Sequence, residues 1–119
     1  MAYIDHDIGL RALGSYVGSS HECVSLVQAW AKVPGGTGTW HPGLHVLENE
    51  THIAKGTAIA TFVDGHYPSD DRHAALFVSG SQQGIVVIDQ WQGQVSHERT
   101  IHFGSHGRQN DPNAYYVID

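Results

Sequence analysis

Two predominantly apolar runs, residues 73–78 and 84–90, constrain the fold of this chain more than any other feature. Five small or polar residues separate the two runs, which is typical of a β-hairpin. Apolar side chains occupy both faces of each run, and such strands occur where both sides of a sheet are covered. The sequence therefore predicts a central pair of antiparallel strands with packing layers on either side.

The rest of the chain predicts one helix before this hairpin and further strands around it. A helix is expected from Ser20, capped by Ser19 or Ser20 and ended by Pro34, because apolar residues recur there at helical spacing. A shorter helix is expected at residues 8–16, and a loop at 34–43. Alternating or β-branched segments predict strands at residues 57–63, 94–103 and 114–118. A helix followed by an antiparallel meander is an α+β fold.

Length and charge exclude several classes of protein. A chain of 119 residues suits one domain, 1–119. Twelve acidic against six basic residues give a formal charge of −6, which argues against a nucleic-acid partner. No apolar run approaches the roughly 20 residues of a membrane span, and the first residues lack a signal-peptide pattern. We therefore expect synthesis in the cytoplasm without a classical signal peptide and no membrane span.

The chain contains one cysteine, Cys23, and ten histidines. A lone cysteine cannot form an internal disulfide, so the fold does not depend on an oxidising compartment. Structural zinc sites normally draw on several cysteines. His41 and His45 have helical spacing, but Pro42 and Gly43 between them prevent the helix that would align them. We expect no metal site and no cofactor.

Cys23 falls in the first turn of the predicted helix, where a thiol can become a nucleophile. A helix N-terminus and a neighbouring histidine both lower the pKa of a thiol. The unpaired N–H groups of the first turn can also form part of an oxyanion hole. This placement is what a cysteine peptidase requires. Burial as a small apolar side chain is the alternative, because free cysteine is among the most buried residue types.

His73 and Asp89 are the candidates to complete a triad with Cys23. If residue 78 pairs with residue 84, His73 lies directly opposite Asp89 on the same face, with Cβ atoms about 5 Å apart. Asp89 can then hold one ring nitrogen of His73 while the other ring nitrogen faces the thiol. A slip of one residue would bring Gln90 to that face instead, and an amide can also orient an imidazole.

Four segments resemble NlpC-type and CHAP-type cell-wall peptidases. In the first segment, a tyrosine and a glycine-rich loop lead into the cysteine, as in the nucleophile segment of those families. In chain order, the other three segments resemble the strand before their catalytic histidine, the strand that carries this histidine, and the strand that carries the third polar residue. The chain is most similar to small single-domain bacterial proteins related to type VI secretion amidase effectors. The four segments are YVGSSHECVSLV (16–27), KGTAIATF (55–62), HAALFV (73–78) and IDQW (88–91).

This resemblance implies a papain-like core, with the cysteine helix packed on the antiparallel sheet. It implies a hydrolase of amide bonds in peptidoglycan peptide stems, in which Cys23 attacks, His73 is base and then acid, and Asp89 orients the imidazole. It further implies an antibacterial effector that acts in the periplasm or cell wall of a target cell. An immunity protein is a further partner that the sequence leaves open. Glu22 and Val24 differ from the residues usual beside the NlpC cysteine, so the bond cleaved also stays open.

Four other residues are candidates for substrate binding. Tyr16 matches a tyrosine that binds substrate or oxyanion in NlpC-type sites, and Gln90 is the register alternative to Asp89. Trp40 and Trp91 are candidates for the walls of a substrate groove. Trp40 in particular is too apolar to be expected on a loop that faces solvent. Core packing is the alternative for Tyr16 and both tryptophans. Two other functions remain open: a non-catalytic module that binds cell-wall peptides or a protein partner, and an enzyme acting on another amide, such as a deamidase.

Overall fold

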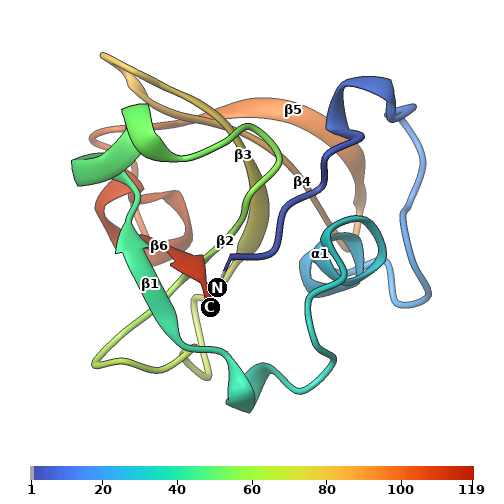
Figure 1. Ribbon diagram of the computed structural model, residues 1–119, viewed down its shortest axis with the longest axis horizontal. Helices are drawn as coiled ribbons and strands as arrows, with labels where there is room; N and C mark the ends of the chain where they lie inside the picture. The colour runs from blue at the N-terminus through green and yellow to red at the C-terminus, as the bar shows by residue number, and fades with distance from the viewer. Residues whose placement is uncertain (1) are drawn as a thin grey trace.

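Residues 2–119 of the chain are described in a computed structural model, so the first residue of the predicted domain lies outside the described part. Within these residues one α-helix precedes a six-stranded antiparallel sheet, which confirms the α+β prediction (Figure 1). The strands lie in the order β1-β6-β2-β3-β4-β5. The elements are α1 (Cys23–Ala31), β1 (Pro42–His45), β2 (Ala58–Thr61), β3 (Ala74–Ser81), β4 (Gly84–Trp91), β5 (Gln94–His102) and β6 (Tyr115–Ile118).

The meander predicted for the second half of the chain is present as β2 to β5. Strand β6 then returns to pair with β2 on one side and with β1 on the other. The sequence analysis missed β1 because it placed this segment at the end of a loop. Only Pro42 and His45 have paired partners in β6, with an irregularity between them, and a proline and a glycine among four residues give no strand-like alternation.

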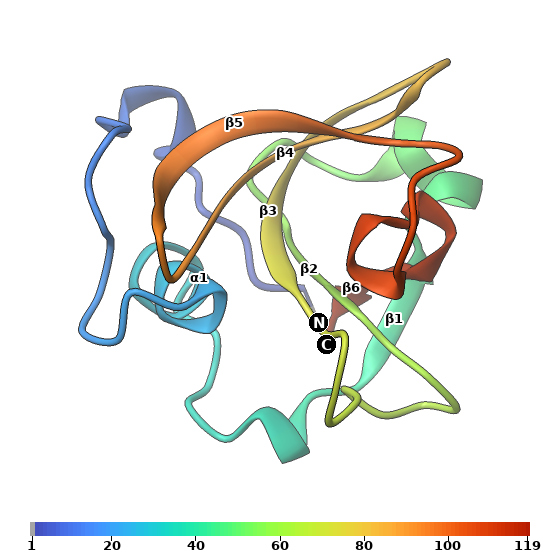
Figure 2. The same ribbon diagram turned by 180° about the vertical axis from the view of Figure 1, so that it is seen from behind.

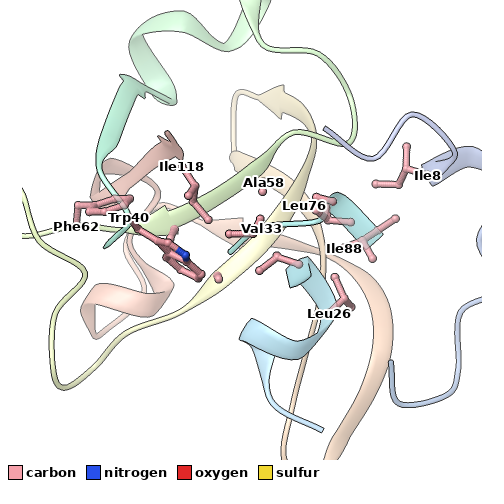
Figure 3. Close-up of a cluster of buried hydrophobic side chains, with 13 residues drawn as sticks. Ile8, Leu26, Val33, Trp40, Ala58, Phe62, Leu76, Ile88 and Ile118 are labelled. Atoms are coloured by element: carbon pink, nitrogen blue, oxygen red, sulfur yellow. The ribbon is translucent and has the colours of Figure 1, made fainter. Parts of the chain in front are cut away.

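Apolar side chains cover both faces of the β3–β4 hairpin, as predicted. On one face, Leu26 of α1 packs with Leu76 and Ile88 of the sheet and with residues from the connecting loops (Figure 3). On the other face, the sheet curves over a second cluster that includes Phe77 and Tyr115. The helix lies beside the hairpin in both views of the ribbon (Figures 1 and 2). Among residues 2–119 no helix is long and apolar enough to cross a bilayer.

The N-terminal half differs from the prediction in its helix boundaries. Helix α1 begins at Cys23, so Glu22 and not Ser19 or Ser20 is the N-cap residue. The hydroxyl of Ser20 instead accepts a hydrogen bond from the N–H of Glu22 at 3.3 Å. The helix expected at residues 8–16 is a single 3₁₀ turn, Ile8–Leu10. Gly14 has a φ of +100°, which no right-handed helix accommodates.

The hairpin register also differs from the prediction. Ser81 pairs with Gly84, so the turn contains two residues and not five, and an irregularity at Val78 shifts the register by one. Beyond it Leu76 pairs with Ile88, which places residue 75 opposite Asp89. His73 is therefore a diagonal neighbour of Asp89 on the same face and does not lie directly opposite it. Long side chains reach across such a diagonal.

Gly84 tests the register between β4 and β5, where it pairs with His102, since its φ of +150° suits only glycine and an added Cβ would collide with the carbonyl oxygen of Ile101. We expect Gly84→Ala to lower the melting temperature by about 5–15 °C, because backbone strain of about 1–3 kcal/mol adds to the collision. Gly38→Ala is the control, as nothing lies within 4 Å of an added Cβ there and the φ of Gly38 is ordinary. Equal melting temperatures in calorimetry for the two variants would contradict the register.

Candidate active site

Cys23 is the first residue of α1, at the end of the helix where the dipole is positive. Its side chain is half-buried, and its Sγ atom lies 4.0 Å from the hydroxyl of Tyr67. The helix begins at Cys23 because the preceding residue, Glu22, has extended backbone angles. It ends before Lys32, whose φ is +63°, and residues 34–36 then keep the chain from continuing as a helix. The Cys23 residue therefore lies at a helix N-terminus, at the edge of the first apolar cluster, against which it packs without being sealed inside it.

His73 and Asp89 form a buried pair beside this thiol. The Nε2 atom of His73 donates to Oδ2 of Asp89 at 2.7 Å, and the two residues are 3% and 0% exposed. The expected contact between them is therefore present, in spite of the shifted register. With Nε2 taken by Asp89, Nδ1 is the ring nitrogen left to interact with the thiol, which shares the wall of one cavity with His73.

The charges of these three groups depend on one another. Burial raises the pKa of the Cys23 thiol, but its hydrogen bond with His73 and the charge of that imidazole lower the pKa below its ordinary value overall. Burial likewise lowers the pKa of His73, whereas the bonds to Asp89 and Cys23 raise it overall to about 9. The arrangement therefore stabilises the thiolate form of Cys23 relative to an ordinary cysteine, beside an imidazole that favours its protonated form.

Asp89 is held by two further groups, both from β5. The Nε atom of Arg99 donates to Oδ2 of Asp89 at 2.8 Å. The Nε2 atom of His97 lies 2.9 Å from Oδ1, although these atoms are not aligned for a hydrogen bond. Burial raises the pKa of Asp89, but His73 and Arg99 lower it overall, so the carboxylate stays ionised.

The sequence analysis missed Arg99 and His97, although a signal was available. Residue 97 pairs with Asp89 in the β4–β5 register. Because side chains alternate along a strand, residues 97 and 99 lie on the same face as Asp89. A histidine and an arginine two residues apart, in the strand that follows a candidate aspartate, are therefore its natural partners.

A cavity of about 210 Å³ opens in front of the thiol. Cys23, His73 and Trp91 lie in its wall, so the expectation that Trp91 borders a groove agrees with the structure. Tyr67 also lines it, and burial raises the pKa of Tyr67, so its hydroxyl remains a hydrogen-bond donor. The sequence analysis missed Tyr67, an aromatic residue in an otherwise polar turn region. The full lining is Glu22, Cys23, Val24, Tyr67, Arg72, His73, Trp91, Gln92 and Gln109.

Three expected substrate-binding residues lie outside this cavity. Trp40 is 2% exposed, donates from Nε1 to the Pro34 carbonyl at 3.1 Å, and belongs to the core, so its predicted place in a groove wall is wrong. Its ring packs against Tyr67 at 4.8 Å between centroids, which supports that cavity residue from behind. Tyr16 stacks on His21, and its hydroxyl accepts from the N–H of Gly93 at 2.9 Å.

Gln90 is fully buried and holds the loop that leads into Cys23. Its Oε1 accepts from the N–H of Val17 at 2.8 Å, and its Nε2 donates to the carbonyls of Val17 and Glu22 at 2.8 and 2.9 Å. The amide oxygen and nitrogen of Gln90 are thus hydrogen-bonded to the backbone of this loop, on the face of β4 that packs against α1. The prediction that Gln90 contacts substrate or replaces Asp89 at His73 is therefore wrong, because adjacent strand residues point to opposite faces.

No group of three or more potential ligands within residues 2–119 is arranged to hold a metal ion. The chemistry that this geometry can support is that of a charged thiolate with a proton donor beside it. That combination suits nucleophilic attack on a carbonyl followed by protonation of the leaving group.

Comparisons with known proteins agree with this geometry. A family model described as domesticated amidase effector 2 matches residues 7–118. The type VI secretion amidase effector 2 protein of Salmonella typhi is 35% identical over 119 aligned positions, which cover 87% of this chain and 88% of that protein. Domesticated amidase effector 2 of Ixodes scapularis is 40% identical over 86 positions, 70% of this chain and 58% of that protein.

A solved structure, titled type 6 secretion amidase effector 2, has the same fold. It superimposes with a TM-score of 0.84 at 31% identity, and the match covers 98% of this chain and 94% of that one. The resemblance to type VI amidase effectors, found from the sequence segments, is thereby confirmed.

The thiol should react at lower pH than an ordinary cysteine, because the thiolate is the reactive form and the pKa of Cys23 is lowered. Since Cys23 is the only cysteine, iodoacetamide labelling measured by mass spectrometry reports on it alone. We expect the labelling rate of Cys23 to reach half of its maximum at a lower pH than that of an unperturbed cysteine in a short peptide, and this pH to rise in His73→Ala. His102→Ala, at an exposed histidine, should leave the profile unchanged. Identical profiles for the two variants would refute the coupling.

Replacing the Gln90 amide should loosen the cysteine loop. In Gln90→Leu the N–H of Val17 and the carbonyl of Glu22 lose the partner shown for them, and each unpaired buried group costs about 1–3 kcal/mol. We expect a melting temperature about 5–15 °C lower by calorimetry. Gln82→Leu, in the exposed hairpin turn, is the matched control and should change the melting temperature little. A stable Gln90→Leu protein would show that the loop is held in another way.

Proposed function

This chain belongs to the domesticated amidase effector 2 family, and on that premise we propose that it is a cysteine hydrolase of amide bonds in peptidoglycan peptide stems. Membership supports amidase chemistry. The observation that carries the cysteine mechanism is the position of Cys23, at a helix N-terminus, in a cavity wall and beside a histidine bonded to a buried aspartate.

In the first step the thiolate of Cys23 attacks the carbonyl carbon of the scissile amide. The bond between sulfur and carbon forms as the carbonyl π electrons move to oxygen, which becomes an oxyanion. The N–H of Ser25 donates to the carbonyl of Glu22 at 3.1 Å, so the donors for this oxyanion are the other backbone N–H groups at the start of α1, those of Cys23 and Val24. The Tyr67 hydroxyl, 4.0 Å from Sγ, is a further donor at the same place.

His73 then supplies the proton that the leaving group needs. The imidazolium donates from Nδ1 to the amide nitrogen as the carbon–nitrogen bond breaks, which releases an amine and leaves a thioester on Cys23. Neutral His73 next removes a proton from water, and the resulting hydroxide attacks the thioester. Collapse of the second tetrahedral intermediate releases the carboxylic acid and restores the thiolate and imidazolium.

Asp89 keeps the imidazole oriented through both steps and stabilises its positive charge. The carboxylate bond to Nε2 fixes which ring nitrogen faces the thiol. The order of helix cysteine, strand histidine and strand carboxylate supports a papain-like arrangement within one domain. The cofactor-independent mechanism requires only the side chains named above and water.

The biological setting follows from the names of the relatives. The Salmonella protein is called a type VI secretion amidase effector, which supports an antibacterial enzyme that acts on the cell wall of a target cell. An enzyme of this kind would endanger its producer in the periplasm, so an immunity protein that blocks the cavity is part of this proposal.

Cys23→Ala tests the proposed function directly. We expect it to lower the cleavage rate of purified muropeptides by at least about 1,000-fold, because no other thiol is present to attack. The melting temperature should change by only a few degrees, and mass spectrometry of the products identifies the bond cleaved. Ser19→Ala, an exposed position in the same loop, is the control and should retain activity.

Three outcomes would overturn this proposal. Full activity in Cys23→Ala would remove the nucleophile from the mechanism. A wild-type protein that binds muropeptides without cleaving them would be a non-catalytic module, and one that hydrolyses only other amides would be a deamidase-like enzyme.

A further inference from the structure

A second cavity, of about 340 Å³, adjoins the one in front of the thiol. Its lining residues are Trp91, Arg99, Gln109 and Asn110, and two of them, Trp91 and Gln109, also line the first cavity. The two hollows are therefore neighbours on one surface. A substrate that extends from Cys23 past Trp91 enters the second cavity.

Basic side chains are more frequent along these two cavities than in the chain as a whole. The protein has six basic and twelve acidic residues. Arg72 lines the first cavity and Arg99 the second, whereas Glu22 is the one Asp or Glu residue among those that line either cavity. Arg99, like Arg11 and Arg108, is paired with an aspartate, but its partner Asp89 is fully buried and does not line the cavities. The groove thus presents two guanidinium groups on an acidic protein.

Arg99 is fixed in place and has hydrogen-bonding capacity left. Its Nε donates to Asp89, its Nη1 donates to Asn110 Oδ1 at 3.4 Å, and its guanidinium lies 5.0 Å from the centre of the Trp91 ring. Within residues 2–119 no acceptor is shown for Nη2. Asp89 also bonds to His73, so a single carboxylate is shared between two cationic partners and does not cancel the charge of Arg99. Arg72 is exposed, and its hydrogen bond to Pro68 is 3.5 Å long.

We propose that the cavity formed by Trp91, Arg99, Gln109 and Asn110 is a substrate subsite for a carboxylate group, which rests on the proposed amidase function. A guanidinium held by a stacked ring and two hydrogen bonds is preorganised for this anion. Asn110 acts through Arg99 as a positioning residue, since its own Nδ2 donates to the His106 carbonyl. The enzyme accordingly selects peptides with an acidic residue next to the bond that it cleaves.

The test compares two muropeptides that differ only in whether one carboxylate beside the scissile bond is free or converted to a carboxamide. We expect kcat/KM to be at least about tenfold higher for the carboxylate, because a charged hydrogen bond is roughly twice as strong as a neutral one. The difference should appear in KM and should shrink at high salt, since the cavity is partly open to solvent. Equal kcat/KM values would overturn the proposal.

A variant that adds a negative charge beside Arg99 tests whether the preference for the carboxylate peptide arises in this cavity. Asn110→Asp places a carboxylate against Nη1 of Arg99, so it should reduce the preference for the acidic substrate toward unity. Asn113→Asp adds the same charge at an exposed position outside the groove, and it should keep the wild-type preference. If Asn110→Asp does not fold, Gln109→Glu introduces the charge at an exposed residue of the same wall. An unchanged preference in the folded variant would overturn the assignment.

Binding to the Cys23→Ala protein separates this proposal from the function on which it rests. Calorimetry with the same two peptides measures the preference without any cleavage. A Kd at least about tenfold lower for the carboxylate peptide supports the subsite even if the wild-type enzyme proves inactive. Equal affinities, or no binding of either peptide, would overturn it even if Cys23 proves to be the nucleophile.

Discussion

The buried carboxylate of Asp89 is the constraint on which the site depends. An ionised group without exposed surface is tolerated only where cations and hydrogen bonds compensate for its lost hydration. Here those partners come from the two neighbouring strands, His73 before β3 and Arg99 from β5. The charge therefore fixes the relative positions of three segments, and removing one partner would leave the other groups uncompensated in the interior. A catalytic role for Asp89 thus rests on the same contacts that position the strands.

Strand β4 sets the position of both reacting groups through two adjacent residues. Asp89 points to one face and fixes the imidazole of His73, whereas Gln90 points to the other face and fixes the loop before Cys23. The alternation of a β-strand thus couples the proposed nucleophile and the proposed base through a single rigid element. A shift of β4 by one residue would exchange the two faces and misplace both groups. This coupling explains how the site is held in place without a disulfide.

The parts of the fold predicted from sequence are those governed by local patterns. The apolar runs of β3 and β4 and the helical spacing after Cys23 each reflect burial of a whole face, so they were found. The hairpin register was not, because the irregularity at Val78 and the two-residue turn depend on backbone geometry at Gly84 that hydrophobicity does not encode. The contact between His73 and Asp89 was still predicted. The observed register places residue 75 opposite Asp89, and a shift of two residues leaves His73 on the same face of the sheet as Asp89. Tyr67, in contrast, joins the site from a segment that only the tertiary fold brings close to Cys23.

Net charge is a poor guide to what this protein binds, and the geometry explains why. Charges separated by more than about 8 Å are largely screened at physiological ionic strength. The acidic residues that make the chain −6 therefore contribute little in the groove when they lie far from it, whereas Arg72 and Arg99 act at contact distance. An acidic surface also limits nonspecific adhesion to anionic polymers. If the proposed subsite is correct, attraction for an anionic peptide is thus confined to the groove beside Cys23, where the proposed reaction takes place.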